Sequence, residues 1–587
     1  MKKEQNTLWG KGLLAASLVL TSASCIPTHE KLTHSADPIA VQSFQEIAVE
    51  FVHHWDDHRH PFSGAAVIDV DQDGTMEIFV GGGEGQEDAL FTFQEGQLVN
   101  IIQGSGLSST TATYGATSID MDHDGDTDLL IARNDGISLY LNDHGSFTQQ
   151  RIPLHLEPDA VPLTIAVSDI NHDGHGDLYI SMFVSKKAFR SATFNDPAHA
   201  KHNVMLLNNG DLTFTDITTS SGTASKQNTF LSAFVDLNGD GWQDLVVAQN
   251  TGEVEIFKNE RNNTFTPIAT NTGYGFWMGL AVGDVDKDGD QDLFFTNVGT
   301  SIPQFLLKGD INDDQRLESQ WVLLRNDGNF VFTDATEAYG LRDYGFAWGT
   351  VFEDINLDGH LDILVAQNYI KWPVHKIWKL PGKSFLQLPS SSANTFVHVD
   401  ELGLTNAHFG QAPIITDLNG DTKPDVVWLN MNGPVRAFLN RSTANGISVA
   451  IPDTVQALGT QVTVETPKAK TYTKQVVTSI GLLSDQSPTL FFGLGEEREI
   501  ARVVLKHPDG SVSVIEHPSL NQPLIVQNNQ LKQNAPRTDQ DWRAGQDSAA
   551  QHMKALRQFP LLCKEEQGEV EVFDDTGNLN KIPLLCK

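Results

Sequence analysis

The sequence has few cysteines and few basic residues, and it lacks the motifs of common catalytic sites. Its 587 residues include three cysteines, and 40 lysines and arginines face 75 aspartates and glutamates. The resulting formal net charge of −35 argues against nucleic acid binding through the bulk surface. We find no nucleophile-elbow serine, phosphate-binding glycine loop or HExxH motif. These absences leave the chain without a recognisable catalytic group and favour a protein that is not an enzyme.

Long apolar runs are also missing, apart from one short stretch near the N-terminus. A basic start, MKKEQNTLWGKG, is followed by LLAASLVLTSASC, which is apolar and then small-residue-rich. This stretch is too short to span a bilayer and predicts a secretory signal peptide over residues 1–24. The small residues before Cys25 resemble a bacterial lipobox, although Ser22 stands where leucine is usual. We therefore expect a lipid on Cys25 and a tether over residues 25–43, with plain secretion as the alternative.

One acidic nine-residue motif is abundant, because the sequence contains seven copies of it. The copies lie about 50 to 70 residues apart, which is a spacing typical of repeat architectures. We call them acidic loops 1 to 7, and they are DVDQDGTME (Asp69–Glu77), DMDHDGDTD (Asp120–Asp128), DINHDGHGD (Asp169–Asp177), DLNGDGWQD (Asp236–Asp244), DVDKDGDQD (Asp284–Asp292), DINLDGHLD (Asp354–Asp362) and DLNGDTKPD (Asp417–Asp425).

The motif has the composition of a calcium site. Asp or Asn occupies positions 1, 3 and 5, glycine usually stands at position 6, and a carboxylate closes position 9. Oxygen ligands at short spacing suit calcium better than magnesium, and glycine permits the positive φ that turns the chain around an ion. The alternative is a set of solvated acidic turns. We predict up to seven calcium ions held by Asp69, Asp71, Asp73, Glu77, Asp120, Asp122, Asp124, Asp128, Asp169, Asn171, Asp173, Asp177, Asp236, Asn238, Asp240, Asp244, Asp284, Asp286, Asp288, Asp292, Asp354, Asn356, Asp358, Asp362, Asp417, Asn419, Asp421 and Asp425.

Two copies depart from the pattern, and we predict that they are the weakest sites. Acidic loop 7 has Thr422 where glycine is expected, and acidic loop 1 ends in Glu77, whose longer side chain alters the cage. The ligand positions together hold 24 of the 75 acidic residues, so much of the negative charge belongs to the predicted metal sites.

Short apolar segments enter and leave each acidic loop, as in YGATSI before loop 2 and LLIAR after it. Their length suits strands, so each loop is predicted to connect two antiparallel strands. Further strands follow in most repeats, and about four strands per repeat predict an all-β fold, a seven-bladed β-propeller. The residues five positions before each loop are mostly small, as expected where the innermost strands crowd together, and they are Gly64, Gly115, Thr164, Leu231, Gly279, Gly349 and Ala412.

The repeats resemble the FG-GAP or VCBS repeats of integrin α-subunit propellers. The phrases FTDITTSSG (Phe214–Gly222) and FTDATEAYGL (Phe332–Leu341) resemble the repeat ends in bacterial relatives of the cartilage acidic protein family. FQEIAVEF (Phe44–Phe51) looks like the same phrase displaced to the N-terminus. The resemblance implies that this segment supplies the outer strand of the last blade and latches the ring.

A second resemblance follows the repeats. The segment Thr478–Ser511, with its LFFGLG and HPDGS phrases, is similar to the ASPIC/UnbV domain. The predicted organisation is therefore a propeller over residues 44–441, a smaller β-rich ASPIC/UnbV-like domain over 442–530, and a linker with a C-terminal hairpin over 531–587. In the hairpin, Cys563 and Cys586 flank a turn at Asp575–Asn578, and an oxidising compartment favours a disulfide between them. Two free buried thiols are the alternative.

Three long insertions follow the strands that leave acidic loops 3, 5 and 6, at Ser185–Asn203, Gly299–Gln320 and Tyr369–Ser384. They begin at one face of the predicted ring, opposite the acidic loops. Two of them combine basic and aromatic residues, including Phe194, His199 and Lys201, which suits an acidic glycan or a partner protein. Alternatively, they merely cover the blade ends. The candidate ligand-binding residues are Lys186, Lys187, Arg190, Lys371, Trp372, Lys376 and Trp378.

One further segment, HHWDDHRH (His53–His60), has imidazoles and carboxylates that could bind a transition metal. Its spacing fits no specific site, and a solvated surface loop is the alternative.

Together these features predict an exported calcium-binding propeller protein that acts in binding or adhesion at a bacterial cell envelope. We expect an outer-membrane or periplasmic lipoprotein, or else a secreted protein, whose partner is an acidic glycan or an envelope or extracellular protein. Contact with a membrane is expected only through the lipid on Cys25. The alternatives are an envelope enzyme that acts on polysaccharide or uses a transition metal, and a scaffold for envelope protein assembly.

Overall fold

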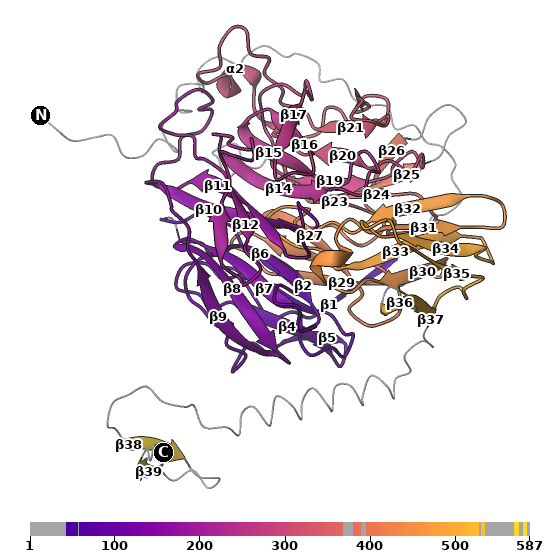
Figure 1. Ribbon diagram of the computed structural model, residues 1–587, viewed down its shortest axis with the longest axis horizontal. Coiled ribbons are helices and arrows are strands. Elements are labelled where there is room, and N and C mark those ends of the chain that lie inside the picture. Colours follow the sequence, from indigo (N-terminus) through magenta and orange to yellow (C-terminus); the bar gives the residue numbers. More distant parts are fainter. Residues whose placement is uncertain are drawn as a thin grey trace, which may run out of the picture. The chain divides into compact units, whose positions relative to one another are not determined.

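The computed structural model describes residues 43–56, 58–367, 380–388, 395–527 and 530–533, and the backbone of 569–573 and 579–583. The repeats form seven antiparallel four-stranded sheets, one for each acidic loop. We call them sheets 1 to 7, and Figure 1 shows them in sequence order from indigo to orange. The predicted fold class, a nearly all-β propeller of repeated four-stranded sheets, is confirmed.

The first four sheets follow the chain without interruption. Sheet 1 contains β2 (Ala65–Ile68), β3 (Glu77–Val80), β4 (Ala89–Gln94) and β5 (Gln97–Asn100). Sheet 2 contains β6 (Thr113–Ile119), β7 (Asp128–Arg133), β8 (Gly136–Asp143) and β9 (Ser146–Ile152). Sheet 3 contains β10 (Ala160–Ser168), β11 (Asp177–Val184), β12 (Val204–Asn208) and β13 (Phe214–Asp216). Sheet 4 contains β14 (Thr229–Val235), β15 (Asp244–Gly252), β16 (Val254–Asn259) and β17 (Phe265–Ile268), and β18 (Gly275–Phe276) also pairs with β15.

The last three sheets complete the repeats, and the final one takes a strand from the N-terminal side. Sheet 5 contains β19 (Leu280–Gly283), β20 (Asp292–Phe295), β21 (Val322–Asn326) and β22 (Phe332–Asp334). Sheet 6 contains β23 (Ala347–Glu353), β24 (Asp362–Gln367), β25 (Lys383–Leu388) and β26 (Thr395–Val399). Sheet 7 contains β27 (Gly410–Thr416), β28 (Asp425–Asn430), β29 (Arg436–Asn440) and β1 (Phe44–Ile47). Because β25 begins at Lys383, the third insertion ends at residue 382, two residues earlier than the sequence suggested.

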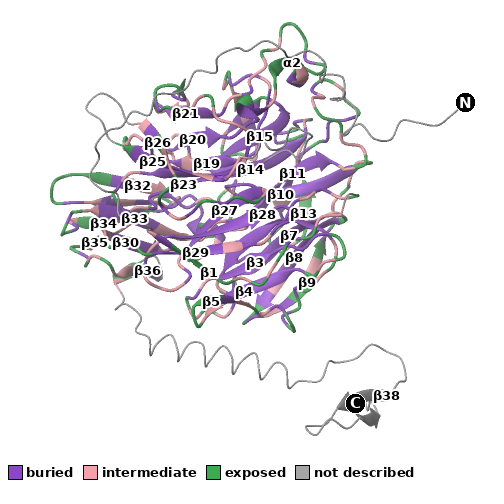
Figure 2. Ribbon diagram, turned by 180° about the vertical axis from the view of Figure 1, so that it is seen from behind, coloured by how far each residue is buried: buried purple, intermediate pink, exposed green. Residues whose placement is uncertain are grey.

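The first strand of each sheet lies innermost, against the first strands of neighbouring sheets. Strands β6, β10, β14 and β27 are buried at every residue, because neighbouring sheets cover both of their faces. Figure 2 shows this burial as purple strands, with exposed residues mainly on loops. A β-carbon on Gly115 would lie 1.9 Å from the Leu163 carbonyl oxygen, so only glycine fits there. The prediction of small residues at these positions is therefore confirmed for the closest approaches.

The ring closes by two contacts between its ends. Strand β1 pairs antiparallel with β29, with Phe44 opposite Asn440, as the displaced N-terminal phrase predicted. The Arg436 guanidinium binds the Glu46 carboxylate through two hydrogen bonds of 2.7 and 2.9 Å. At the inner end, the Gln411 side chain exchanges two hydrogen bonds of 2.6 and 2.8 Å with the backbone of Ser63.

A smaller β domain follows the ring and consists of two sheets. One sheet has the order β33 (Thr489–Gly495), β30 (Asn445–Ala450), β36 (Pro523–Gln527) and β37 (Gln530–Gln533), with β30 and β36 parallel. The other has the order β32 (Thr471–Gln475), β31 (Gln461–Glu465), β34 (Arg502–Lys506) and β35 (Val512–Glu516). Strand β37 extends the domain to residue 533, beyond the predicted boundary at 530. We call it the second domain.

The second domain and the ring share a hydrophobic core. Val462 and Leu505 of the second domain belong to the same buried cluster as Leu130 of sheet 2 and Ile165 of sheet 3. All four side chains are at most 1% exposed, so the contact excludes water. Full burial of such side chains contributes about 1.5 to 3 kcal/mol each, which makes the contact a stable part of the fold.

Helices contribute little to the described residues. They are α2 (Gln304–Leu307), η2 (Gly299–Ser301) and η3 (Val455–Ala457). Among the residues with a described structure, no helix has the length and apolar character needed to cross a membrane. Strands β38 (Glu569–Phe573) and β39 (Leu579–Pro583) pair antiparallel within the predicted C-terminal segment 531–587. The signal peptide, Cys25, Cys563 and Cys586 lie outside the described residues.

Strand β1, which closes the ring by pairing with β29, gives a first prediction. Phe44 is 4% exposed and packs in a buried cluster with residues of sheets 6 and 7, whereas the adjacent Gln45 points outward. Removing a buried phenylalanine ring costs about 3 kcal/mol or more, so Phe44→Ala should lower the free energy of unfolding by that order. Gln45→Ala should change it by less than about 0.5 kcal/mol. Denaturant unfolding of both variants measures the difference, and equal effects would show that β1 does not secure the ring.

Candidate metal-binding loops

All seven acidic loops have the same backbone conformation. Position 6 has positive φ in each, between 68° and 101°, at Gly74, Gly125, Gly174, Gly241, Gly289, Gly359 and Thr422. Position 4 also has positive φ, between 57° and 70°, at Gln72, His123, His172, Gly239, Lys287, Leu357 and Gly420. The sequence predicted the turn at position 6 but not the one at position 4, where five of the residues are not glycine.

The position 1 carboxylate closes each loop. Its Oδ2 accepts a hydrogen bond from the backbone N–H of position 6 at 2.7 to 3.2 Å in every copy. This bond forms even in acidic loop 7, where the Thr422 N–H lies 2.7 Å from Asp417. Thr422 is β-branched and has φ 68°, a conformation that such residues rarely adopt. Loop 7 therefore keeps the shared geometry at a conformational cost.

The position 9 carboxylate joins the loop to its sheet. One oxygen accepts the backbone N–H of position 2 at 2.8 to 3.2 Å in all seven loops. In loops 2 to 7 the other oxygen accepts a backbone N–H near the end of the third strand, at 2.6 to 3.0 Å. In loop 1, Glu77 instead accepts the Thr92 hydroxyl at 2.9 Å, so the longer side chain changes this contact.

The residue at the end of the third strand continues this network to the neighbouring sheet. Its side-chain amide donates to the position 2 carbonyl of the preceding loop at 2.8 to 3.0 Å in five sheets. These residues are Asn142, Asn259, Asn326, Gln387 and Asn440. We call them the relay amides. The sequence analysis missed them, although the recurring Asn in YLND, FKNE, LLRN and FLNR was a signal that could have identified four of them.

Burial and mutual repulsion raise the pKa values of carboxyl groups at positions 1 and 9 of the loops. Burial is the main cause of a raised pKa of about 7 for Asp128 and about 8 for Asp177, Asp244 and Asp292. At position 1, burial followed by the nearby Asp288 raises the pKa of Asp284 to about 7. Crowded, desolvated carboxylates of this kind are stabilised by a cation, which restores the balance of charge.

The loops offer oxygen ligands that fit a hard cation. Ligand atoms of Asp120, Asp122 and Asp128 lie within 4.8 Å of one another, and so do those of Asp69, Asp71 and Asp73 and those of Asp284, Asp286 and Asp292. Buried Oδ1 of Asp286 has no hydrogen-bond donor, as expected for an oxygen reserved for an ion. The remaining loops carry Asn at position 3, which supplies a neutral oxygen instead of a carboxylate. Such all-oxygen sets suit calcium.

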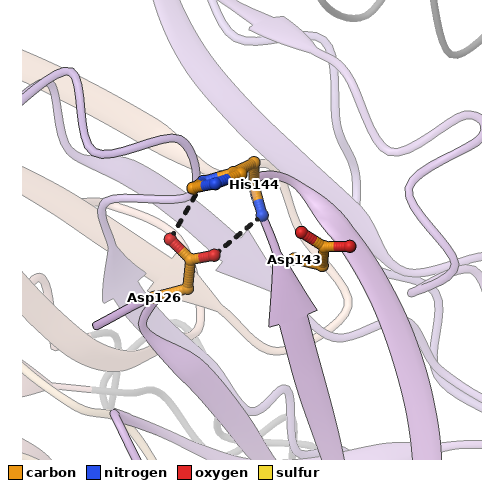
Figure 3. A group of neighbouring side chains, drawn as sticks. All are labelled: Asp126, Asp143 and His144. Atoms are coloured by element: carbon orange, nitrogen blue, oxygen red, sulfur yellow. Dashed lines mark hydrogen bonds and ion pairs between the residues drawn. The ribbon is translucent and has the colours of Figure 1, made fainter. Parts of the chain in front are cut away.

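Another cluster of possible ligands lies beside acidic loop 2. Figure 3 shows His144 bonded to Asp126 through its ring and its backbone N–H, whereas Asp143 stands apart without a bond to either. The Asp126 carboxylate also accepts Gln72 Nε2 at 2.5 Å and is 4% exposed. Asp126 is therefore held by hydrogen bonds that join loops 1 and 2, and the group is best described as a structural contact.

The segment His53–His60 does not assemble a metal site in the described residues. His60 is buried, its Nε2 lies 2.8 Å from the Val184 carbonyl oxygen, and its ring stacks on Phe62. His53 is buried elsewhere and accepts the Asn432 N–H at 3.1 Å through Nδ1. Burial lowers the pKa of each ring to about 4. His53 and His60 therefore serve separate packing contacts, and the described residues of this segment do not gather around one ion.

The first insertion is more buried than its composition suggested. Phe194 is 2% exposed, His199 is buried and bonds Asn228 at 3.0 Å, and the Lys201 ammonium donates to the Pro158 carbonyl at 3.0 Å. The expectation that these three residues face a ligand is wrong, because they fix the insertion on the ring. Lys186, Lys187 and Arg190 remain on its surface. Lys371, Trp372, Lys376 and Trp378 lie outside the described residues.

Comparisons with known proteins agree with this architecture. Residues 69–131, 120–180 and 236–295 match the FG-GAP-like repeat, and residues 452–533 match the ASPIC and UnbV domain. Cartilage acidic protein 1 of Mus musculus is 23% identical over 547 residues, covering 78% of this chain and 81% of that protein. The Homo sapiens protein is 23% identical over 485 residues, covering 69% of this chain and 70% of its own length. The predicted resemblance to both domains and to the cartilage acidic protein is confirmed.

The similarity of the chain to solved structures is weaker. A lectin of Agrocybe aegerita that recognises non-reducing terminal N-acetylglucosamine has a TM-score of 0.35 and 16% identity, covering 65% of this chain and 90% of its own. A rhamnogalacturonan lyase of Bacillus licheniformis has a TM-score of 0.38 and 12% identity, covering 68% and 76%. Overlaps of this extent carry no functional argument.

The relay amides give a second prediction. Asn326 donates to the carbonyls of Leu237 at 2.8 Å and Gln291 at 3.3 Å, and it is fully buried. Asn326→Ala leaves both buried carbonyls without this donor, so we expect a loss of about 2 kcal/mol in the free energy of unfolding. The exposed Asn312→Ala should be neutral within about 0.5 kcal/mol. Chemical denaturation compares the two, and a neutral Asn326→Ala would mean that the relay does not hold sheets 4 and 5 together.

The raised carboxyl pKa values give a third prediction. A carboxyl group with a raised pKa in the folded state binds more protons there than when unfolded, so it destabilises the metal-free protein as pH rises from about 4 to about 8. Calcium competes with these protons and removes the repulsion. The increase in melting temperature on adding calcium should therefore be larger at about pH 8 than at about pH 5. Melting curves with calcium and with EDTA at both pH values test this, and an increase that shrinks with rising pH contradicts it.

Proposed function

We propose that this chain, which combines FG-GAP-like repeats with an ASPIC and UnbV domain, is an extracellular calcium-binding protein. Its function is to bind a partner through the side of the ring opposite the acidic loops. The homology to cartilage acidic protein 1 and the domain pair support an extracellular binding protein. We further propose export to a bacterial cell envelope, with a lipid on Cys25.

Calcium has a structural role in this proposal. The residues at positions 1, 3, 5 and 9 of each loop would hold the ion, and its charge would offset the carboxylate repulsion described above. At a calcium concentration ten times the dissociation constant, one site stabilises its surroundings by about 1.4 kcal/mol. Several such sites would add up to a large part of the stability of a domain, because typical values are about 5 to 15 kcal/mol.

One observation favours the opposite side as the binding surface. The second domain hydrogen-bonds to the backbone of acidic loops 2 to 6, as in the 2.8 Å bond from Gly495 N–H to the Leu357 carbonyl. That side of the ring is therefore already engaged. The long insertions leave from the ends of β11, β20 and β24, which point away from the acidic loops. Loops that project from a rigid scaffold commonly carry binding function.

Two segments that are far apart in the sequence, His53–His60 and the first insertion, lie against each other on this side. The Lys186 ammonium lies 5.1 Å from the centre of the Trp55 ring, which brings the N-terminal His53–His60 segment against the first insertion. Lys187 is exposed and joins none of the ion pairs found among the described residues, whereas Arg190 pairs with Asp196 at 2.5 Å. We name Trp55, Lys186 and Lys187 the aromatic-basic patch. An indole beside the Lys186 ammonium, with a second lysine next in the chain, suits an acidic glycan.

The binding proposal gives a fourth prediction. Trp55→Ala with Lys187→Ala should weaken binding to uronate-rich or sulfated polysaccharide at least about tenfold, and added salt should weaken binding by the unmodified protein. The matched control is Trp242→Ala with Lys258→Ala, which changes a half-buried tryptophan and lysine on the other side of the ring.

Binding is measured on a glycan panel and by pull-down from envelope extract, each with calcium and with EDTA. Equal binding by both double variants, with melting temperatures unchanged, would place the ligand elsewhere. Capture of a protein instead of a glycan through the same patch would assign the partner to the protein class.

A further inference from the structure

A segment of the second domain occupies the axis of the ring. Residues Thr478–Asp485, which we call the axial segment, pair with innermost strands that lie apart in the sequence. Gly481 exchanges two backbone hydrogen bonds with Leu280 of β19, at 2.9 and 3.2 Å. On the other side, Asp485 N–H donates to the Ala65 carbonyl of β2 at 2.9 Å, and Ala65 N–H donates to the Leu483 carbonyl at 3.3 Å. One short segment therefore links sheets 1 and 5 through the centre.

Side chains of the axial segment reach further sheets. The Ser479 hydroxyl donates to the Ile165 carbonyl of β10 at 2.6 Å, and Asp485 accepts the Ser118 N–H of β6 at 3.0 Å. Leu482 and Leu483 are fully buried in the same apolar cluster as innermost residues of the ring. The axial segment thus completes the core of the ring.

The second domain also rests on the backbone of five acidic loops. Loop 2 is bonded through Asp120 N–H, which donates to the Asp453 carbonyl at 2.8 Å. In loops 3, 4 and 5 the glycine carbonyls accept side-chain donors at 2.8 to 3.2 Å, namely Gly174 from Gln456, Gly239 from Lys506 and Gly289 from Gln461. In loop 6 the Leu357 carbonyl accepts Gly495 N–H at 2.8 Å. Because these bonds are made to backbone groups of the loops, they form only when each loop keeps its turn conformation.

Loop 6 has the closest contact with the second domain. A β-carbon on Gly493 would lie 2.0 Å from Asp354 Oδ2 and 2.4 Å from Leu357 Cα. The space between β33 and the position 1 carboxylate of this loop therefore admits no side chain. In contrast, we find no hydrogen bond from the described part of the second domain to residues 417–425 of acidic loop 7.

We propose that calcium in the acidic loops holds the second domain on the ring and keeps the axial segment inserted. This inference rests on the proposed calcium binding. Without the ion, three or four carboxylates repel one another within each loop, and the loop backbone loses the turn that the second domain recognises. Five loops must present their main chain together, so loss of calcium releases the domain and opens the axis. The ring and the second domain are thus coupled through the ions.

Hydrogen exchange of the full chain tests the proposal. Peptides that cover residues 478–486 should be protected in calcium and should exchange at least about a hundredfold faster in EDTA. Peptides from the middle of β7 and β15 should stay protected under the same conditions. Bound calcium is counted separately by elemental analysis of the same samples.

A matched pair of variants compares loop 6, which contacts the second domain, with loop 7, which makes no hydrogen bond to its described part. Asn356→Ala and Asn419→Ala each remove the same position 3 oxygen, from loop 6 and loop 7 respectively. The calcium concentration needed to protect residues 478–486 should be at least about fivefold higher for Asn356→Ala than for Asn419→Ala. Equal effects of the two variants would overturn the proposal.

A docking variant substitutes none of the predicted ligands, although its β-carbon would press on Asp354 of loop 6. Gly493→Ala should expose the axial segment even in calcium, with β7 and β15 still protected and with an unchanged calcium count at loop 7 and the other loops that keep their geometry. The exposed Val512→Ala in the same domain is the control. Normal protection of residues 478–486 in Gly493→Ala contradicts the tight contact at loop 6.

The outcomes distinguish this inference from the function on which it rests. Absence of bound calcium refutes the proposed calcium binding. Bound calcium with identical exchange of residues 478–486 in calcium and EDTA refutes the coupling alone. Equal exchange of the axial segment, β7 and β15 in EDTA would mean that the whole ring unfolds, which also overturns the release of one domain from an intact ring.

Discussion

The architecture depends on a buried carboxylate at the end of each acidic loop. It accepts one hydrogen bond from the start of its own loop and, in six sheets, one from the third strand. In five sheets the residue on that strand then donates to the preceding loop. Loop, sheet and neighbouring sheet are therefore held by one connected network. Such networks are strong when every member is satisfied and costly when one is removed, so the acidic repeat is a structural element in its own right, apart from the metal binding proposed for it.

The sequence predicted the features that are local and repeated. Acidic loops, their flanking strands and the small innermost residues follow from spacing and composition within a few residues of each motif. The N-terminal strand was also predicted, because its phrase repeats those at the ends of sheets 3 and 5. Position 4 of the loops escaped prediction, since His123, Lys287 and Leu357 adopt positive φ only when the surrounding turn imposes it.

Contacts between distant segments could not be read from the sequence. The TSIGLLSD phrase looks like an ordinary turn-rich connection, and its place among the innermost strands β2, β6, β10 and β19 depends on the completed ring. Likewise, the burial of Phe194 and Lys201 depends on neighbours that the chain supplies far away, such as Tyr274 and Pro158. Composition identified these residues as aromatic and basic, but only the tertiary fold decides whether such side chains face solvent or the core.

The latch between β1 and β29 has a consequence for how the molecule comes to be folded. Glu46 and Arg436 are 390 positions apart, so the last sheet cannot be completed until nearly the whole repeat region is available. Contacts of such long range close slowly, because a long loop must be ordered first. A chain that emerges progressively from a ribosome or a translocation channel therefore presents open-ended sheets until late. Ring closure is therefore a late step of folding, wherever the chain folds.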